Sequence, residues 1–387
     1  MNDHAELLRS AALRIGERGL PAPELRLVAE LSDVQRRNLL LRCELLSSGV
    51  SRGSVIIKQV RGDYSPAQLD AWDTRRFFSD WVGAELLSSL DGEPNAARFL
   101  AGDRELGFIV LQDLGDPHVS PLQLLLKGNP AQATAALEKY VVRLARLHGS
   151  TLGARPRYDG LLASLQGSQM LQPLRYFGQD SAEKLCAFLR EIEPLSDELA
   201  SVIHATVAKL EEPGPFQAFI HGDPCLDNAF LLEDGLLLID FEMGRPAHAL
   251  LDAVYVLSPF PTCGCAGHLP NQLAFDLLEI YRIELSRFTS AAADEKLFNQ
   301  GVLDACSAWL VYRLGWLLRD AWHDDTRHWS MGTSRARILS ALEQYGVVSR
   351  RLGGSARLLG HAERLLVELR ARWPNSSPLP LYPAFRT

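Results

Sequence analysis

The hydrophobic and polar positions first follow a helical period and then change to extended runs. Apolar side chains recur at helical spacing over residues 7–15, which predicts a short amphipathic helix. Three extended apolar runs follow at residues 25–31, 39–46 and 54–60, with short connections between them. Consecutive strands with short connections favour an antiparallel meander.

After these runs, the pattern predicts one helix and then one further pair of strands. A helix is expected from Pro66, a favourable first-turn residue after Ser65, to about residue 90. Strands are expected at residues 97–101 and 108–112, joined by a glycine-containing turn. The first part of the chain is therefore predicted to be rich in β-structure.

Helical patterning dominates after residues 113–117, which carry no regular period. We therefore expect an N-terminal lobe over residues 1–113 and a larger, mostly helical C-terminal lobe over residues 114–387. The fold class predicted from this order is α+β. The helices expected in the second lobe cover residues 121–127, 130–148, roughly 180–210, 247–257, 271–288, 294–322, 334–352 and 356–373.

Two short apolar runs inside the helical part end in acidic residues. Asp223 follows the run at residues 216–220, and Asp240 follows the run at residues 236–239. Asn228 lies between them, and a short turn connects the two runs. We expect these three oxygen-bearing side chains to lie together in one open site. Carboxylate and carboxamide oxygens suit Mg²⁺, and a remaining carboxylate can act as a base for a hydroxyl nucleophile.

Composition and charge describe an ordinary soluble globular protein. Of the 387 residues, 47% are hydrophobic and 22% are charged, and the net charge is −7. A nucleic-acid-binding protein usually has a basic stripe, so this balance argues against nucleic acid as a partner.

The chain carries no predicted membrane segment and no predicted disulfide framework. Its longest apolar run, residues 307–318, is interrupted by Arg313 and Gly315 and falls short of the ~20 residues that cross a bilayer. The first residues are too charged for a signal peptide. Six cysteines in a chain of this size do not indicate a disulfide framework. We therefore expect a cytoplasmic protein.

Two motifs carry a resemblance to a known family. They are His-Gly-Asp-x-x-x-x-Asn at residues 221–228 and Ile-Asp-Phe-Glu at residues 239–242. In the order of elements over roughly residues 20–350, the chain resembles the aminoglycoside phosphotransferase and choline kinase family. These are small-molecule kinases with a protein-kinase-like, two-lobe fold. The resemblance implies a phosphotransferase that uses ATP and Mg²⁺ and acts on a hydroxyl group.

The resemblance also implies roles for single residues. Asp223 matches the catalytic base, and Asn228 and Asp240 match the Mg²⁺ ligands. Lys58 matches the lysine that contacts the α- and β-phosphates, and Glu85 matches its ion-pair partner. Phosphoryl transfer needs positioning and neutralised charge, which such a set can supply.

Two further matches concern the hinge and the base of the catalytic loop. Gln112, Asp113 and Leu114 resemble the hinge whose backbone hydrogen-bonds adenine. Asp252 resembles the aspartate that braces the catalytic loop from below.

The turn at residues 32–38 departs from the protein-kinase pattern because it contains no glycine. Protein kinases place a glycine-rich loop over the phosphates at this point. Small-molecule kinases often keep a Ser-Asn pair here, which Arg37-Asn38 matches in part. Arg36 or Arg37 is therefore a candidate for contacts to phosphate oxygens.

Two other groups of residues have competing interpretations. Cys263 and Cys265 with His268 suggest zinc, but a fourth ligand at suitable spacing is missing, so a loop with unpaired thiols is favoured. Cys225 is expected to be a reactive thiol within the catalytic loop.

An aromatic and acidic group could line an acceptor pocket for a cation, although core packing is the commoner explanation. Its members are Trp309, Trp316, Asp320, Trp322, Asp324, Asp325 and Trp329.

Three functions remain open from the sequence. The first is an ATP-dependent kinase of a small-molecule hydroxyl, with an aminoglycoside, amino alcohol or sugar-like acceptor. The second is a pseudokinase of the same fold that binds nucleotide or a partner as a regulatory module. A protein kinase is disfavoured because the helical part has no activation-segment pattern. Neither the acceptor nor the oligomeric state is specified by the sequence.

Overall fold

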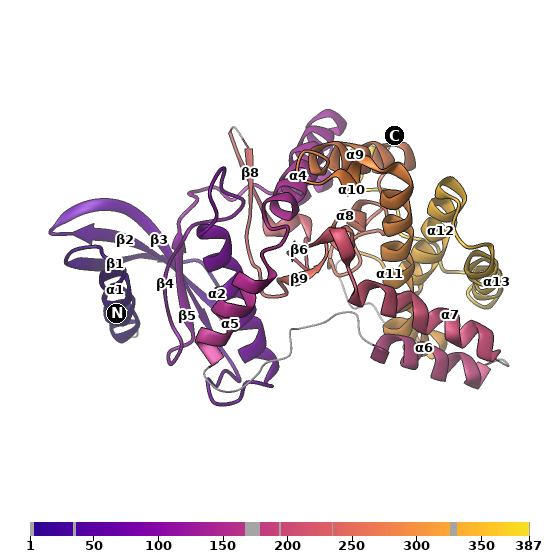
Figure 1. Ribbon diagram of the computed structural model, residues 1–387, viewed down its shortest axis with the longest axis horizontal. Helices are drawn as coiled ribbons and strands as arrows, with labels where there is room; N and C mark the ends of the chain where they lie inside the picture. Colours follow the sequence, from indigo (N-terminus) through magenta and orange to yellow (C-terminus); the bar gives the residue numbers. More distant parts are fainter. Residues whose placement is uncertain are drawn as a thin grey trace. The chain divides into compact units, whose positions relative to one another are not determined.

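The computed structural model of the chain contains two compact units, which are described separately (Figure 1). Unit 1 comprises Met1–His118, Arg155–Leu174 and Leu237–Arg245, and unit 2 comprises Val119–Ala154, Arg175–Leu236 and Pro246–Thr387. The structure describes residues 4–33, 36–166, 179–192, 195–233, 235–325 and 331–386. Trp329 and parts of the turns at 32–38 and 233–235 lie outside these ranges.

Unit 1 contains a five-stranded sheet in the order β1-β2-β3-β5-β4. Neighbouring strands are antiparallel throughout. The predicted meander is β1-β2-β3, and β5 inserts between β3 and β4, so that Lys58 pairs with Ile109. The strands are β1 (Pro23–Glu30), β2 (Asn38–Ser47), β3 (Val50–Val60), β4 (Phe99–Asp103) and β5 (Phe108–Gln112).

Side-chain alternation divides this sheet into two faces. Helix α1 (Ala5–Glu17) buries its apolar stripe in one cluster with Val55 and Ile57 of β3. Because successive side chains of a strand point to opposite faces, Lys58 points away from that cluster. In Figure 1, β4 lies between α1 and α2.

Helix α2 (Trp72–Ser88) begins six residues later than the start predicted at Pro66. Isolated turns occupy the segment before it, with hydrogen bonds from Gln68 N to Ser65 O (3.0 Å) and from Ala71 N to Gln68 O (3.1 Å). The ring of Trp81 packs where a Cβ at Gly102 of β4 would lie, so this glycine permits the close approach of helix and strand. Helix α5 (Arg155–Gln166) packs against α2 within the same unit.

Unit 2 is mostly helical, as predicted. Helix α4 packs against α9, and the long α11 packs against α6 and α12 (Figure 1). The helices are α3 (Pro121–Lys127), α4 (Pro130–Ser150), α6 (Gln179–Ile192), α7 (Asp197–Ala208), α8 (Leu250–Ala253), α9 (Asn271–Leu285), α10 (Ser290–Ala293), α11 (Glu295–His323), α12 (Ser334–Leu352) and α13 (Ala356–Arg372). The single helix predicted at residues 247–257 is wrong. Strand β9 (Arg245–His248) and a 3₁₀ turn (Val254–Val256) flank the short α8 instead.

Short strands lead into both acidic motifs. Strand β6 (Gln217–Ile220) precedes Asp223 and pairs with β9. Strand β7 (Ala229–Leu232) pairs with β8 (Gly235–Leu238), which precedes Asp240. The boundary between the units falls within β8, and the lobe division at residues 113/114 stays a prediction.

The order of elements matches the predicted α+β class, with a small antiparallel sheet first and a larger helical part after it. Among the helices of the described residues, none is both long and apolar enough to span a bilayer.

Candidate active site

A buried lysine lies at the centre of a carboxylate cluster in unit 1. The side chain of Lys58 is 12% exposed, and its Nζ lies 2.7 Å from Asp80 Oδ2, 2.6 Å from Asp240 Oδ1 and 3.1 Å from Glu242 Oε1. Burial opposes the charge, but the three carboxylates outweigh it and raise the pKa of Lys58 well above its usual value. The lysine is therefore a fixed positive charge at neutral pH.

Asp80 of α2 holds both Lys58 and the motif that contains Asp240. Its Oδ1 accepts a hydrogen bond from the backbone N–H of Phe241 (2.9 Å), and its Oδ2 pairs with Lys58. Burial raises the pKa of Asp80 to about 6, although the charge of Lys58 acts in the opposite direction. One buried aspartate thus connects helix α2, strand β3 and the Ile-Asp-Phe-Glu segment.

The predicted ion pair between Lys58 and Glu85 is wrong. Glu85 pairs with Arg18 of unit 1 (2.8 Å) and accepts a hydrogen bond from Trp81 Nε1 (2.7 Å). Five residues of an α-helix turn through about 500°, so Asp80 and Glu85 point in directions roughly 140° apart. Asp80 faces Lys58, and the sequence alone did not fix which acid of this helix does so.

Glu242 is buried among positive charges. Arg37 and Arg76 both pair with its Oε2, and Asn38 Nδ2 donates a hydrogen bond to its Oε1 (2.5 Å). Burial opposes ionisation, but Lys58, Arg76 and Arg37 lower the pKa of Glu242 far below its usual value. Arg37, a sequence candidate for phosphate contacts, is therefore bound to a carboxylate here.

Asp240 differs from its two acidic neighbours because its side chain is 37% exposed. Its backbone has φ of +70°, a left-handed conformation that aspartate tolerates better than most residues and that is common at functional sites. The carboxylate atoms of Asp80, Asp240 and Glu242 lie within 4.8 Å of one another. Since protein partners occupy the oxygens of Asp80 and Glu242, Asp240 is the member best suited to bind a metal ion.

The predicted hinge begins at the last residue of β5. Gln112 pairs with Val55 of β3. The Asp113 carboxylate binds Arg42 Nε (2.8 Å) and Ser54 Oγ (2.7 Å). Burial acts against ionisation, yet these hydrogen bonds and that from the Gly115 N–H lower the pKa of Asp113. The side chain of Asp113 therefore secures the hinge, while adenine binding by residues 112–114 stays a prediction.

In unit 2, a buried aspartate supports the His-Gly-Asp loop. Asp252 accepts hydrogen bonds from the backbone N–H groups of His221 (2.7 Å) and Gly222 (3.2 Å). Its Oδ2 also lies 3.2 Å from Nε2 of the buried His148. The bracing position expected for Asp252 is therefore present in the structure.

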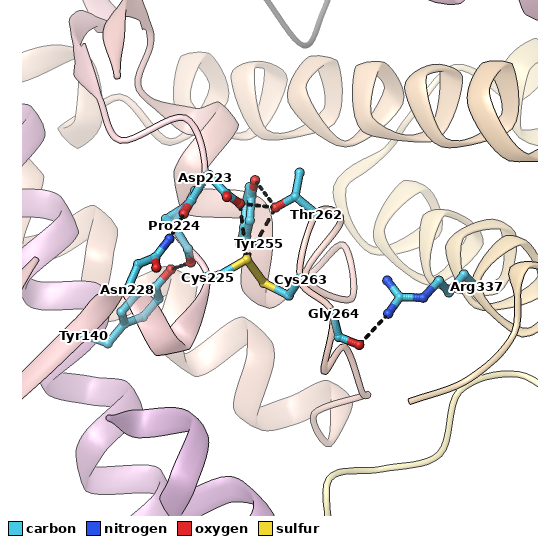
Figure 2. Close-up of a disulfide and its surroundings, with 10 residues drawn as sticks. All are labelled: Tyr140, Asp223, Pro224, Cys225, Asn228, Tyr255, Thr262, Cys263, Gly264 and Arg337. Atoms are coloured by element: carbon cyan, nitrogen blue, oxygen red, sulfur yellow. Dashed lines mark hydrogen bonds between the residues drawn. A yellow bond between two sulfur atoms is a disulfide. The ribbon is translucent and has the colours of Figure 1, made fainter. Parts of the chain in front are cut away.

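Asp223 is held by the segment that follows the 3₁₀ turn at Val254–Val256. The hydroxyl of Thr262 donates a hydrogen bond to Asp223 Oδ1, and Tyr255 Oη lies 3.1 Å from the same hydroxyl (Figure 2). Asn228 Nδ2 donates to the backbone carbonyl of Asp223 (3.0 Å), which leaves Asn228 Oδ1 as the atom that can bind a metal ion. No sequence pattern had marked Thr262.

Cys225 and Cys263 form a disulfide, so the prediction that both are unpaired thiols is wrong. Their Cα atoms lie 5.4 Å apart, within the usual range for such bonds. The bond joins the His-Gly-Asp loop to the segment that carries Thr262, and Cys225 Sγ lies 3.2 Å from Asp223 Oδ1 (Figure 2). Because the two cysteines lie 38 positions apart in the sequence, the sequence alone did not reveal this pairing.

The aromatic group suggested for a cationic acceptor is already engaged by the protein. Trp309 is buried, and its Nε1 donates to Leu251 O (2.9 Å). Lys184 lies over the ring of Trp316 at 3.3 Å, and Arg372 lies over the ring of Trp322 at 3.9 Å. These described rings bind the protein's own cations or fill its core.

The model of the phosphotransferase enzyme family matches residues 50–281 of the chain, a span that includes the Lys58 cluster and the His-Gly-Asp loop. The chain belongs to this family. It is therefore a phosphotransferase, and its α+β fold is the class predicted from the order of elements. The family and enzyme class expected from the two motifs are confirmed.

Solved structures of similar proteins include small-molecule kinases. A choline/ethanolamine kinase family protein from Mesorhizobium loti shares 15% identity, with 95% of this chain and 98% of that chain covered and a TM-score of 0.44. A choline kinase from Cryptosporidium parvum Iowa II shares 13% identity, with coverage of 96% and 98% and a TM-score of 0.47. An amicoumacin kinase, in complex with AMP-PNP and Ca²⁺, shares 11% identity, with coverage of 98% and 96% and a TM-score of 0.42. No curated protein sequence matches the chain significantly.

The sequence candidates thus form two groups. Lys58 and Asp240 come together in unit 1, where Asp80 and Glu242 join them. Asp223 and Asn228 come together in unit 2. That Asp223 and Asp240 lie together in one site stays a prediction.

Proposed function

We propose that this phosphotransferase is an ATP- and Mg²⁺-dependent kinase that transfers the γ-phosphoryl group to a small-molecule hydroxyl. The observation that carries the proposal is the buried Lys58, held by Asp80 and by the half-exposed Asp240. A fixed cation beside an accessible carboxylate suits a nucleotide phosphate that arrives with its metal ion.

Each residue has a role in this proposal. Lys58 binds phosphate oxygens, and residues 112–114 bind the adenine through their backbone. Asp223 orients the acceptor hydroxyl and accepts its proton. Asn228 and Asp240 supply oxygens for Mg²⁺, which when bound neutralises phosphate charge. The proposal also includes a cytoplasmic location and an acceptor such as an aminoglycoside, an amino alcohol or a sugar.

The test measures ADP release with saturating MgATP and a panel of aminoglycosides, amino alcohols, sugars and hydroxy acids. We expect at least one member to stimulate release well above the rate with water alone. In parallel, MgATP should raise the melting temperature of the wild-type protein. A melting shift without turnover on any acceptor would favour the nucleotide-binding pseudokinase instead.

Loss of Asp240 tests the metal assignment separately. In Asp240→Ala, we expect MgATP to bind at least tenfold more weakly, while metal-free ATP binding changes little, because Asp240 is proposed to act through the ion. The exposed Asp227→Ala is a matched control. Unchanged MgATP titration in Asp240→Ala would remove Asp240 from the metal site.

A further inference from the structure

Arg313 interrupts the longest apolar run of the sequence and lies buried on α11. The residue is only 4% exposed. The described residues provide no hydrogen bond and no ion pair to its guanidinium, and Nη1 is buried without a partner. Burying an unpaired charge is costly, so the place of this arginine requires a reason.

The guanidinium lines a cavity within unit 2. The cavity lies between α11, α12 and the segment at residues 257–261, and its volume, measured as the space open to the centre of a water-sized sphere, is about 20 Å³. Ser258, Gln344, Tyr345 and Trp309 are among the residues that line it. The space is therefore small and mainly apolar, and Arg313 is the charged residue among the described residues that line it.

The surroundings of Arg313 add positive rather than negative charge. Burial, and then the nearby charge of Arg337, lower the pKa of Arg313 to about 9, so it remains charged at neutral pH. Arg337 is itself buried, and its Nη2 donates to the backbone carbonyl of Gly264 at 2.9 Å (Figure 2).

We propose that this cavity is a binding site for a small oxyanion, a carboxylate or phosphate group, with Arg313 as its main ligand. A guanidinium binds both groups through two parallel, charge-assisted hydrogen bonds. The bound anion supplies the negative charge that the described residues around Arg313 do not.

The site lies beside the segment that holds the catalytic loop. Pro261 lines the cavity, and the next residue, Thr262, donates a hydrogen bond to Asp223. The anion can be free in solution, or it can be part of the acceptor alcohol. The second source rests on the proposed function and would favour a hydroxy acid or a phosphorylated alcohol over a polycation.

The test compares melting temperatures in sodium phosphate and in sodium chloride of equal ionic strength. We expect about 20 mM phosphate to raise the melting temperature of the wild-type protein by roughly 2–4 °C, and Arg313→Met to remove that rise. Arg319→Met is the matched control, because Arg319 lies on the same helix but is exposed and paired with Glu191 (2.7 Å). Its phosphate-induced rise should equal that of the wild type.

Acetate, glycerate and glycerol separate the two sources of the anion. A shift with phosphate or acetate indicates a free anion. A shift with glycerate alone, with none from glycerol, indicates an anionic group on a larger alcohol. Either result supports the site only if Arg313→Met abolishes the shift in melting temperature. Arg313→Lys should retain a smaller shift in melting temperature.

Two results would overturn the proposal. One is the absence of any shift in the wild-type protein with phosphate, acetate and glycerate. The other is an equal shift in the wild-type protein and Arg313→Met. If Arg313→Met does not fold, an unchanged shift in Arg313→Lys has the same meaning. None of these melting measurements depends on turnover, so the site can fail while the kinase activity stands.

Discussion

At the scale of single residues, neighbours decide what each carboxylate of this enzyme can do. Asp80 and Glu242 are buried and bound to cations of unit 1, so they serve as supports. Asp240 is half-exposed, and Asp223 accepts a hydrogen bond from the hydroxyl of Thr262 through one oxygen. The two less buried carboxylates are the ones to which we assign contact with reactants.

The first prediction concerns the proposed base. We expect Asp223→Asn to lower kcat by roughly 10²–10⁴, because an amide cannot accept the proton of the acceptor hydroxyl. The melting shift caused by MgATP should persist. Asp227→Asn, an exposed change four residues further along the same loop, should leave kcat within about twofold. A kcat within threefold of the wild type in Asp223→Asn would show that the base is another group.

The second prediction compares the two acids of α2. In Asp80→Asn we expect the KM for MgATP to rise roughly 10- to 100-fold, because Lys58 loses a buried charged partner. In Glu85→Gln it should change less than about twofold, because Glu85 pairs with Arg18. Steady-state kinetics with varied MgATP measures both. Equal effects of the two substitutions would contradict the pairing seen here.

At the scale of elements, the His-Gly-Asp loop is stabilised mainly by its connections to other segments. Its backbone N–H groups at residues 221 and 222 bind Asp252 from α8, and Thr262 binds Asp223. The Cys225–Cys263 disulfide fixes the same two segments covalently. Short strands and turns therefore keep a defined geometry although they contribute few ladder hydrogen bonds of their own.

The third prediction tests this covalent connection. Reduction should lower the free energy of unfolding by about 4 kcal/mol, because closing a loop of 38 residues restricts the unfolded chain. Urea unfolding with and without a dithiol reductant measures the difference. The double variant Cys225→Ser, Cys263→Ser should resemble the reduced wild type and should not respond to the reductant. A response of equal size in both proteins would show that the reductant acts elsewhere.

At the scale of the whole molecule, buried histidines make the free energy of unfolding depend on pH. Burial lowers the pKa of His248 to about 4, although the charge of Asp304 acts in the opposite direction. Because the unfolded pKa is near 6.5, the folded state binds fewer protons between about pH 4 and 6.5. The stability from this group is therefore complete above pH 6.5 and is lost as the pH falls to about 4.

The fourth prediction follows from this direction of the pH dependence. The free energy of unfolding should fall by up to roughly 3 kcal/mol through His248 alone as the pH drops from 7 to 4. His248→Gln should flatten the decline over this range, whatever its effect at pH 7. His323→Gln, a change at an exposed histidine, should leave the decline as in the wild type. Parallel pH profiles of the wild type and His248→Gln would disprove the assignment.

The sequence by itself determined the order of elements and the chemistry of the motifs. Periods of two and 3.6 residues reflect which side chains face a core, so the strands expected at residues 39–46 and 54–60 and the helix expected at 130–148 fall within the observed β2, β3 and α4. The residue types and spacing of Asp223, Asn228 and Asp240 were local features too. The family and the enzyme class followed from them.

Only the tertiary structure decided which distant groups meet. The choice of Asp80 over Glu85 depends on the rotation of α2 against the sheet, and one turn of a helix cannot be fixed from sequence periodicity. The Cys225–Cys263 bond and the isolation of Arg313 depend on how elements far apart in the chain pack together. Burial and pairing are properties of that packing, and they turn an ordinary acid, thiol or arginine into a functional group.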